Sequence, residues 1–136
     1  MLAVDATVVR LFLHVLAATV WVGGQLTLAG LVPGLRDLSP DAPRAVARRF
    51  DRIAWPAYGV LVATGIWNLF EVSLSDRSTE WQVTLFVKLV LVALSGASAL
   101  AHRAASSKVV LAAGGALAGL SSLGALFLGV QLAFAG

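Results

Sequence analysis

Long runs of apolar residues separated by short polar segments dominate the chain. A helix that crosses a membrane needs about 20 mostly apolar residues, because the hydrocarbon layer is about 30 Å thick and each residue rises about 1.5 Å. Four runs reach this length, at about residues 8–32, 53–74, 81–101 and 109–134. The pattern predicts an all-α membrane protein, a single domain built as an up-and-down bundle of four transmembrane helices.

The ends of these runs carry their own signals. We expect the first run to be a retained helix, because it is too long for the apolar part of a signal peptide. Pro33 and Gly34 should end it. Residues 39–43, with the sequence Ser-Pro-Asp-Ala-Pro, resemble a helix start, since Ser or Asp can cap free amides and Pro fits the first turn. A short interfacial helix over Arg44 to Asp51 is therefore expected before the second run.

Composition supports the membrane class. Hydrophobic residues make up 59% of the chain and charged residues only 12%, against about 25% charged in an average soluble domain. There is no cysteine, which excludes disulfides, thiolate metal sites and cysteine nucleophiles. The net charge is +3, and its basic residues gather in loops. Contact with anionic lipid headgroups explains them better than binding of nucleic acid, for which no motif is present.

The basic residues also predict the orientation. The segments after the first and third runs contain seven of them: Arg36, Arg44, Arg48, Arg49, Arg52, Arg103 and Lys108. Cytoplasmic loops hold the excess of Lys and Arg in membrane proteins. We therefore expect a multi-pass protein of a bacterial-type cytoplasmic (plasma) membrane, with both termini outside.

Small residues are concentrated in the fourth run, where Gly115 and Gly119 form a Gly-xxx-Gly pair that Ala118 and Ser122 extend. Small faces let helices approach closely in lipid. Packing within the chain is the favoured interpretation, and a homodimer through these faces is the alternative.

Polar side chains inside the apolar runs are the candidate site, because they are costly there and usually face the interior of a bundle. His14, Asn68, Lys88 and Gln131 each lie within about 10 Å of the outer interface, judged from the rise per residue. On the first run, His14 shares one helix stripe with Trp21 and Gln25. Inward-facing stripes would create a small polar chamber in the outer half of the protein.

Other interpretations exist for each of these residues. Lys88 could extend its stem to the outer headgroups, and His14 could simply bond to a backbone carbonyl or to Asn68. His102 is expected to be a solvated loop residue. Trp55 is expected to be an interface anchor, and so is Trp81. Gln25 could bond across helices.

The residue types present limit which metal or cofactor the protein could bind. The two histidines are predicted near opposite faces of the membrane, so they cannot both bind one metal or one haem within a chain. His14 remains as one ligand, with a second from Lys88, Asn68, Gln131, water or a neighbouring subunit. Copper(I) prefers thiolate and thioether ligands, and Met1 is the only sulfur-containing residue. A dedicated copper(I) relay is therefore poorly supplied.

Several segments resemble the membrane domain of copper-resistance protein D (CopD) proteins over about residues 8 to 105. In the first run, the match extends from Arg10-x-x-x-His14 to Trp21-Val-Gly23-Gly24. For the second run, the matching residues are Arg49-Phe50 and residues 64–69 (Thr-Gly-Ile-Trp-Asn-Leu). For the third run, they are Lys88-Leu89 and His102-Arg103. The resemblance implies copper as the metal. In related HemJ-type protoporphyrinogen oxidases, a first-helix histidine and a third-helix lysine are implicated in haem handling, and His14 and Lys88 would take these roles here.

Three functions follow as hypotheses. In the first, a CopD-like protein handles copper at the outer leaflet. His14 binds the metal, Lys88 and Asn68 line the site, and Trp21 closes its floor. In the second, the chain binds haem b with His14 as the axial ligand and Lys88 nearby. In the third, it is a structural membrane subunit without a cofactor. Whether any reaction is catalysed is left open.

Overall fold

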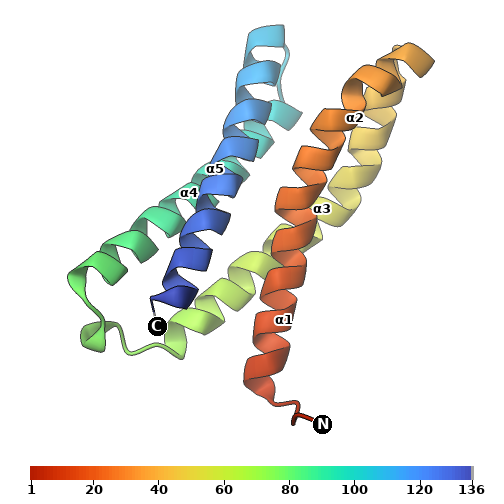
Figure 1. The fold of residues 1–136 in the computed structure, drawn as a ribbon. Coiled ribbons are helices and arrows are strands. Elements are labelled where there is room, and N and C mark those ends of the chain that lie inside the picture. Colours follow the sequence, from red (N-terminus) through yellow and green to blue (C-terminus); the bar gives the residue numbers. More distant parts are fainter. Residues whose placement is uncertain (136) are drawn as a thin grey trace. The chain divides into compact units, whose positions relative to one another are not determined.

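A computed structural model of the protein describes residues 1–135 and consists of helices joined by short loops (Figure 1). The elements are α1 (Ala6–Ala18), the π-helical turn η1 (Thr19–Gly23), α2 (Gly24–Leu38), α3 (Ala42–Phe70), the 3-10 turn η2 (Leu74–Asp76), α4 (Thr79–Arg103) and α5 (Lys108–Phe134). Because α1, η1 and α2 form one continuous helix, the described chain contains four helices long and apolar enough to cross a membrane. This confirms the predicted all-α fold class, and the chain is a multi-pass membrane protein.

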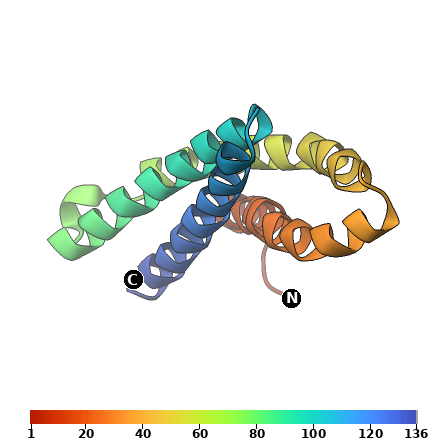
Figure 2. The same ribbon diagram turned by 90° about the horizontal axis from the view of Figure 1, so that it is seen from above.

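The chain divides into two compact units. In the unit Met1–Val72, the continuous α1–η1–α2 helix runs beside α3. In the unit that begins at Ser73, α4 packs against α5, and Figures 1 and 2 show these two helices as a hairpin. That all four helices form one bundle and one domain stays a prediction.

Three helices begin at a polar side chain that accepts a hydrogen bond from the first turn. Asp5 Oδ1 accepts from the Val8 amide at 2.9 Å. Ser78 Oγ accepts from the Trp81 amide and Ser107 Oγ from the Val110 amide, both at 3.2 Å. The first amides of a helix have no partner inside the helix, so such caps stabilise helix starts by about 1 kcal/mol each. They fix where α1, α4 and α5 begin.

Two helix boundaries differ from the prediction. The first helix continues through Pro33 to Leu38, although the proline removes one backbone hydrogen bond. Near the end of a helix, water can satisfy the carbonyl that loses its partner. The expected short helix over Arg44 to Asp51 is the first part of α3. No glycine separates it from the apolar run, so the helix starts at Ala42 and continues.

Small side chains form the contact between α4 and α5. Ser95, Gly96 and Ser98 are buried on α4. The buried residues of α5 are Gly114, Ala118, Ser121, Ser122 and Ala125. Small residues allow two helix backbones to approach closely, and here the Ser95 hydroxyl donates a hydrogen bond across the interface to the Ala118 carbonyl at 3.0 Å.

This contact differs in detail from the predicted Gly-xxx-Gly pair. A Cβ atom added at Gly119 would meet nothing within 4 Å, so Gly119 is not part of the close contact. One added at Gly114 would lie 3.0 Å from the His102 backbone nitrogen. The small-residue face therefore serves packing within the hairpin, as the favoured interpretation expected, while a homodimer stays a prediction.

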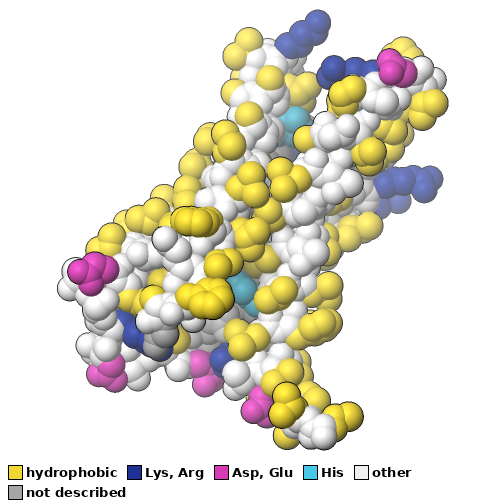
Figure 3. Space-filling model, viewed as in Figure 1, with side chains coloured by type: hydrophobic (Ala, Val, Ile, Leu, Met, Phe, Trp, Pro, Cys, Tyr) yellow, Lys and Arg dark blue, Asp and Glu magenta, His cyan; other side chains and the backbone are white. Residues whose placement is uncertain are grey.

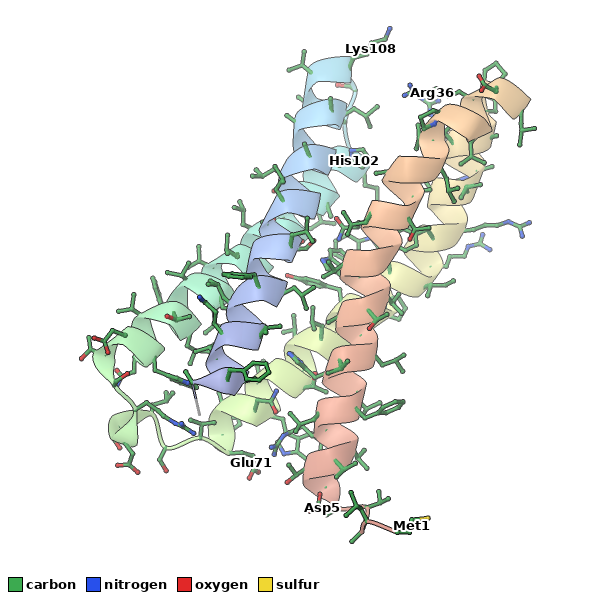
Figure 4. All side chains as sticks on the ribbon, viewed as in Figure 1. Met1, Asp5, Arg36, Glu71, His102 and Lys108 are labelled. Atoms are coloured by element: carbon green, nitrogen blue, oxygen red, sulfur yellow. The ribbon has the colours of Figure 1, made fainter. Side chains whose placement is uncertain are left out.

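Large apolar side chains cover the outside of the helices. Phe12, Phe86, Leu120 and Phe127 are each more than 60% exposed. Figure 3 shows apolar side chains along the helices and charged ones near their ends, and Figure 4 labels Asp5 and Glu71 at one end of the first unit and Arg36 at the other. Such a surface is unfavourable in water and suited to lipid.

Candidate functional site

A seam of polar residues runs between α1 and α3 in the first unit. α1 contributes Arg10 and His14, which are one helical turn apart. α3 contributes Thr64 and Asn68, and Glu71 directly follows its last residue. The three share one face by their spacing of four and three residues. The structure thus brings the predicted site residues His14 and Asn68 to one helix pair. We call these five residues the polar seam.

His14 and Thr64 form the central contact of the polar seam. Nδ1 of His14 lies 2.8 Å from Oγ1 of Thr64. The same hydroxyl donates to the carbonyl of Val60 at 2.7 Å and approaches that of Leu61 at 3.2 Å. A hydroxyl has one hydrogen to donate, and these carbonyls can only accept it. Thr64 Oγ1 must therefore accept from His14, so Nδ1 carries the proton and Nε2 carries the lone pair.

This arrangement matches what a metal-binding histidine requires. The hydrogen bond at one ring nitrogen sets the tautomer and the orientation of the ring, and the other nitrogen is the ligand. Gly65 of α3 lies beside the ring, and a Cβ added there would be in ordinary contact with it, 3.6 Å from Cε1 of His14. The partner of Nδ1 is a hydroxyl group, which was not among the predicted partners of His14, a backbone carbonyl or Asn68. Sequence spacing placed Thr64 on the correct stripe but did not single it out.

Arg10 lies at the end of the polar seam near the start of α1 and is only 9% exposed. Nη1 of its guanidinium is 3.7 Å from Oε2 of Glu71, and its Cζ is 5.8 Å from the centre of the Trp67 ring. Its Nε atom is buried without a hydrogen-bond partner among the described residues, and so is Oδ1 of Asn68. Sequence analysis did not propose Arg10 for the site, although its position one turn before His14 was a usable signal.

Trp21 lies in the π-helical turn and is 3% exposed. Its ring centroid is 5.1 Å from that of Trp55 and 4.5 Å from that of Tyr58. The Gln25 amide donates to the Trp21 carbonyl at 2.9 Å, so this bond is within the helix and not across helices as predicted. A π-helical turn frequently marks a functional site, and this one lies two turns from His14.

Trp55 has a packing contact inside the first unit, and its predicted role as an interface anchor stays a prediction. It lies thirteen residues after the start of α3 at Ala42. The side chain packs edge-on against Trp21, with ring planes at 66°. Aromatic pairs of this geometry contribute about 0.5–1.5 kcal/mol beyond their buried area. The three rings hold the middle of the first helix against α3.

Lys88 belongs to the second unit, on α4. Its Nζ atom lies 3.3 Å from the position of a Cβ added at Gly129 of α5, so the absent side chain at Gly129 makes room for the ammonium group. The predicted chamber shared by His14 and Lys88 stays a prediction, because the two residues lie in different units.

His102 lies at the end of α4, in the second unit. It is exposed, as predicted, but its ring is held in place. Nδ1 of His102 contacts the Leu111 carbonyl at 2.5 Å, and a Cβ added at Gly115 would lie 3.0 Å from the same nitrogen. Figure 4 labels it at the same end of the hairpin as Lys108. His102 is thus a packing residue between α4 and α5.

Within residues 1–135, no three His, Cys, Asp or Glu side chains come together as a metal-binding group. The polar seam offers one imidazole nitrogen, one amide oxygen and the carboxylate of Glu71. This set is smaller than the set of about four protein ligands that structural metal sites use.

The sequence was compared with known proteins to identify its family. Searches of curated proteins and of solved structures found no match, and they add no support for the haem alternative. A comparison with protein families matches residues 44–136 to the family described as copper resistance protein D. The match includes α3, α4 and α5, and His14 and Trp21 lie before it. Since it spans more than half of the sequence, the chain belongs to the copper resistance protein D family.

Proposed function

We propose that this membrane protein handles copper at the polar seam, with His14 as the metal ligand. The observation that carries the proposal is the hydrogen bond from His14 Nδ1 to Thr64 Oγ1 at 2.8 Å. It gives Nε2 the lone pair that a metal ion needs. Family membership supplies copper as the ion. Copper is the cargo in this proposal and not a permanent cofactor.

The donor set favours copper(II) over copper(I). The polar seam contributes nitrogen and oxygen donors, and the chain contains no cysteine. Imidazole binds copper well, whereas copper(I) prefers sulfur ligands. Asn68 Oδ1 is buried without a partner among the described residues, and it lies one helical turn from Thr64. Binding an ion would satisfy this oxygen, since buried polar atoms usually have partners.

Arg10 and Glu71 form the outer end of the proposed site. The side chain of Glu71 is 54% exposed, whereas that of Arg10 is 10% exposed. An exposed carboxylate attracts cations, while its neighbouring guanidinium limits how strongly it holds them. Glu71 would therefore collect copper ions, and His14 would bind them deeper in the seam. Trp21 would bound the site two turns further along the helix.

From the sequence alone, Lys88 is a further candidate for the lining of this site, because it is predicted at a similar depth to His14. The absence of cysteine makes the proposal directly testable. A His14→Cys and Lys88→Cys double variant should be joined by a short bifunctional thiol reagent, whereas His14→Cys with Lys108→Cys should not. Failure of the first pair to react would remove Lys88 from the site and leave the role of His14 standing.

Copper retention tests the main proposal. The purified protein is equilibrated with copper(II), dialysed and analysed for metal content. Wild-type protein should retain copper in proportion to its concentration, and His14→Ala should lose most of it. His102→Ala is the matched control, because it removes the other histidine, and it should retain copper. Equal retention by wild type and His14→Ala would contradict the proposal, as would a loss confined to His102→Ala.

A further inference from the structure

A groove lies in the second unit between the start of α4 and the end of α5. Its volume is about 580 Å³. The lining residues are Ser78, Glu80, Trp81, Thr84, Gln131, Leu132, Phe134 and Ala135. All of them belong to the α4–α5 hairpin, and none belongs to the polar seam.

The distribution of side-chain sizes explains why the groove forms at this end. The buried small residues lie between Ser95 and Ser98 on α4 and between Gly114 and Ala125 on α5. Figures 1 and 2 both show the two helices close together near their connection and farther apart toward the start of α4 and the end of α5. Trp81 and Phe134 occupy the separated ends. Large side chains there leave a space that the helices do not close.

The position of the groove at the helix ends predicts that it lies at the depth of the lipid headgroups. Both elements that form it are ends of membrane-length helices, and ends of such helices meet the interface between hydrocarbon and water. Leu132 and Phe134 provide apolar surface, while Glu80, Thr84 and Gln131 provide polar groups. A ligand that fits both must itself be amphipathic.

The indole N–H of Trp81 is a hydrogen-bond donor that is not satisfied by the described residues. Its Nε1 atom is buried and has no hydrogen-bond partner among the described residues. An indole N–H is only a donor and usually finds an acceptor when buried. A phosphate oxygen is such an acceptor, and it would satisfy this group.

Two opposite charges lie near Trp81. The guanidinium of Arg77, just outside the groove lining, lies over its ring, with Cζ 5.0 Å from the centroid, and the carboxylate of Glu80 lines the groove. The loop that carries Arg77 is fixed, because the Gln82 amide donates to the carbonyls of Leu74 and Arg77 at 2.9 and 3.0 Å. A cation and an anion on a fixed support match a headgroup that has both charges.

We propose that this groove binds a phospholipid with a primary ammonium headgroup, phosphatidylethanolamine. Its phosphate meets Arg77 and the Trp81 N–H, its ammonium donates to Glu80, and an acyl chain lies along Leu132 and Phe134. A primary ammonium suits Glu80 because it donates hydrogen bonds, which the quaternary ammonium of phosphatidylcholine cannot do. Phosphatidylglycerol has the phosphate but lacks the cation.

Native mass spectrometry of the full chain in detergent tests the proposal. The protein is titrated with phosphatidylethanolamine, phosphatidylcholine or phosphatidylglycerol of identical acyl chains, and with soluble phosphoethanolamine. Phosphatidylethanolamine should bind about tenfold more tightly than either other lipid, as expected for a hydrogen bond to a charged group. Phosphoethanolamine should bind much more weakly, because it lacks the acyl chains.

Variants assign the binding to the groove. Glu80→Gln should lower phosphatidylethanolamine affinity about tenfold and leave phosphatidylglycerol affinity unchanged. Asp76→Asn is the matched control, because it removes a carboxylate four residues before Glu80 that does not line the groove, and it should bind as wild type does. Trp81→Phe should lower the affinity for all three lipids.

Several outcomes would overturn the proposal. Equal affinity for the three lipids would show nonspecific binding, and an unchanged Glu80→Gln would show that the ammonium is not recognised there. If phosphoethanolamine bound as tightly as the lipid, a soluble ligand would replace the lipid as the occupant. Because Glu80 is exposed, its substitution should not prevent folding, so each result is interpretable.

Discussion

Thr64 is bonded to the backbone of its own helix, and this bond decides what it can offer to His14. Its hydroxyl hydrogen points to the Val60 carbonyl, which leaves an oxygen lone pair for the imidazole at 2.8 Å. The effect is local and chemical, because it selects one of two tautomers of a neutral ring. At the residue scale, the proposed site therefore depends on a side chain that would not itself touch the metal.

Substitution of Thr64 tests this assignment. In wild-type protein, the ¹⁵N spectrum of His14 should show a neutral ring protonated at Nδ1. Thr64→Val keeps the shape but removes the acceptor, so the ring should become a mixture of both tautomers. Thr27→Val is the control, because Thr27 makes a similar bond to its own helix thirteen residues from His14. An unchanged His14 spectrum in Thr64→Val would contradict the assignment.

A second residue-scale prediction concerns neighbouring glycines in the first helix. A Cβ added at Gly24 would lie 2.3 Å from Cε2 of Phe50, whereas one added at Gly23 would meet nothing within 4 Å. Gly24→Ala should therefore destabilise the protein by about 1–3 kcal/mol through overpacking. Gly23→Ala should be neutral or stabilising by up to about 1 kcal/mol.

Thermal unfolding in detergent measures both glycine variants under the same conditions. The expected order of melting temperatures places Gly24→Ala below wild type and Gly23→Ala at or above it. Equal melting temperatures for the two variants would show that the Phe50 ring moves aside without cost.

At the scale of elements, the α4–α5 hairpin depends on small residues that let two backbones meet. Ser95 is 1% exposed and bonds to the carbonyl of Ala118. In lipid, close packing and hydrogen bonds between helices replace the hydrophobic force that drives association in water. The hairpin is therefore sensitive to added volume at one face of α5 and tolerant at another.

Gly114 and Gly119 lie on these two different faces of α5. Gly114→Ala would bring a methyl group to 3.0 Å from the backbone of His102, which cannot move away as a side chain could. It should lower stability by about 1–3 kcal/mol. Gly119→Ala meets open space and should stabilise the helix slightly. Comparable denaturation curves for both variants would contradict this account of the hairpin.

The apolar runs predicted the existence of these elements well, and their ends less well. Run length reports burial in lipid, but it does not show that a helix continues through Pro33 or starts at Ala42. The π-helical turn over Thr19–Gly23 has no simple sequence signature, and it adds a residue to one turn. A helix face predicted from regular α-helical spacing is therefore shifted beyond Trp21. Gln25, which was predicted to share the face of His14 and Trp21, bonds within its own helix.

The candidate site was predictable in part. Helical spacing placed Thr64, Asn68 and Glu71 on one face of α3, because i, i+4 and i+7 positions always share a face. Which of them meets His14 depends on the rotation of the two helices about their axes. That rotation follows from packing at positions such as Gly65 and the Trp21 ring cluster, and spacing alone does not reveal it.

At the scale of the whole molecule, loop charges predict the orientation in the membrane. The last turn of the first helix contains Arg36, and the segment from there to the apolar part of α3 contains Arg44, Arg48, Arg49 and Arg52. The positive-inside rule places this loop in the cytoplasm. Both termini would then lie outside, and His14, near the start of the first helix, would be in the outer half.

Single cysteines test this orientation, since the chain has none of its own. Ser75→Cys, in the loop before α4, should react with a membrane-impermeant maleimide in intact cells. Ser39→Cys, in the loop before α3, should react only after the membrane is opened. The opposite pattern would reverse the topology and move His14 to the cytoplasmic half.

The central claim is that Nε2 of His14 binds copper while Nδ1 stays bonded to Thr64. Pulsed electron paramagnetic resonance of the copper(II)-loaded protein tests it directly, because it detects the remote protonated nitrogen of a bound imidazole. The account predicts the signal of one imidazole, absent in His14→Ala, retained in His102→Ala and shifted in Thr64→Val. A spectrum without imidazole coupling, or one that persists in His14→Ala, would contradict it.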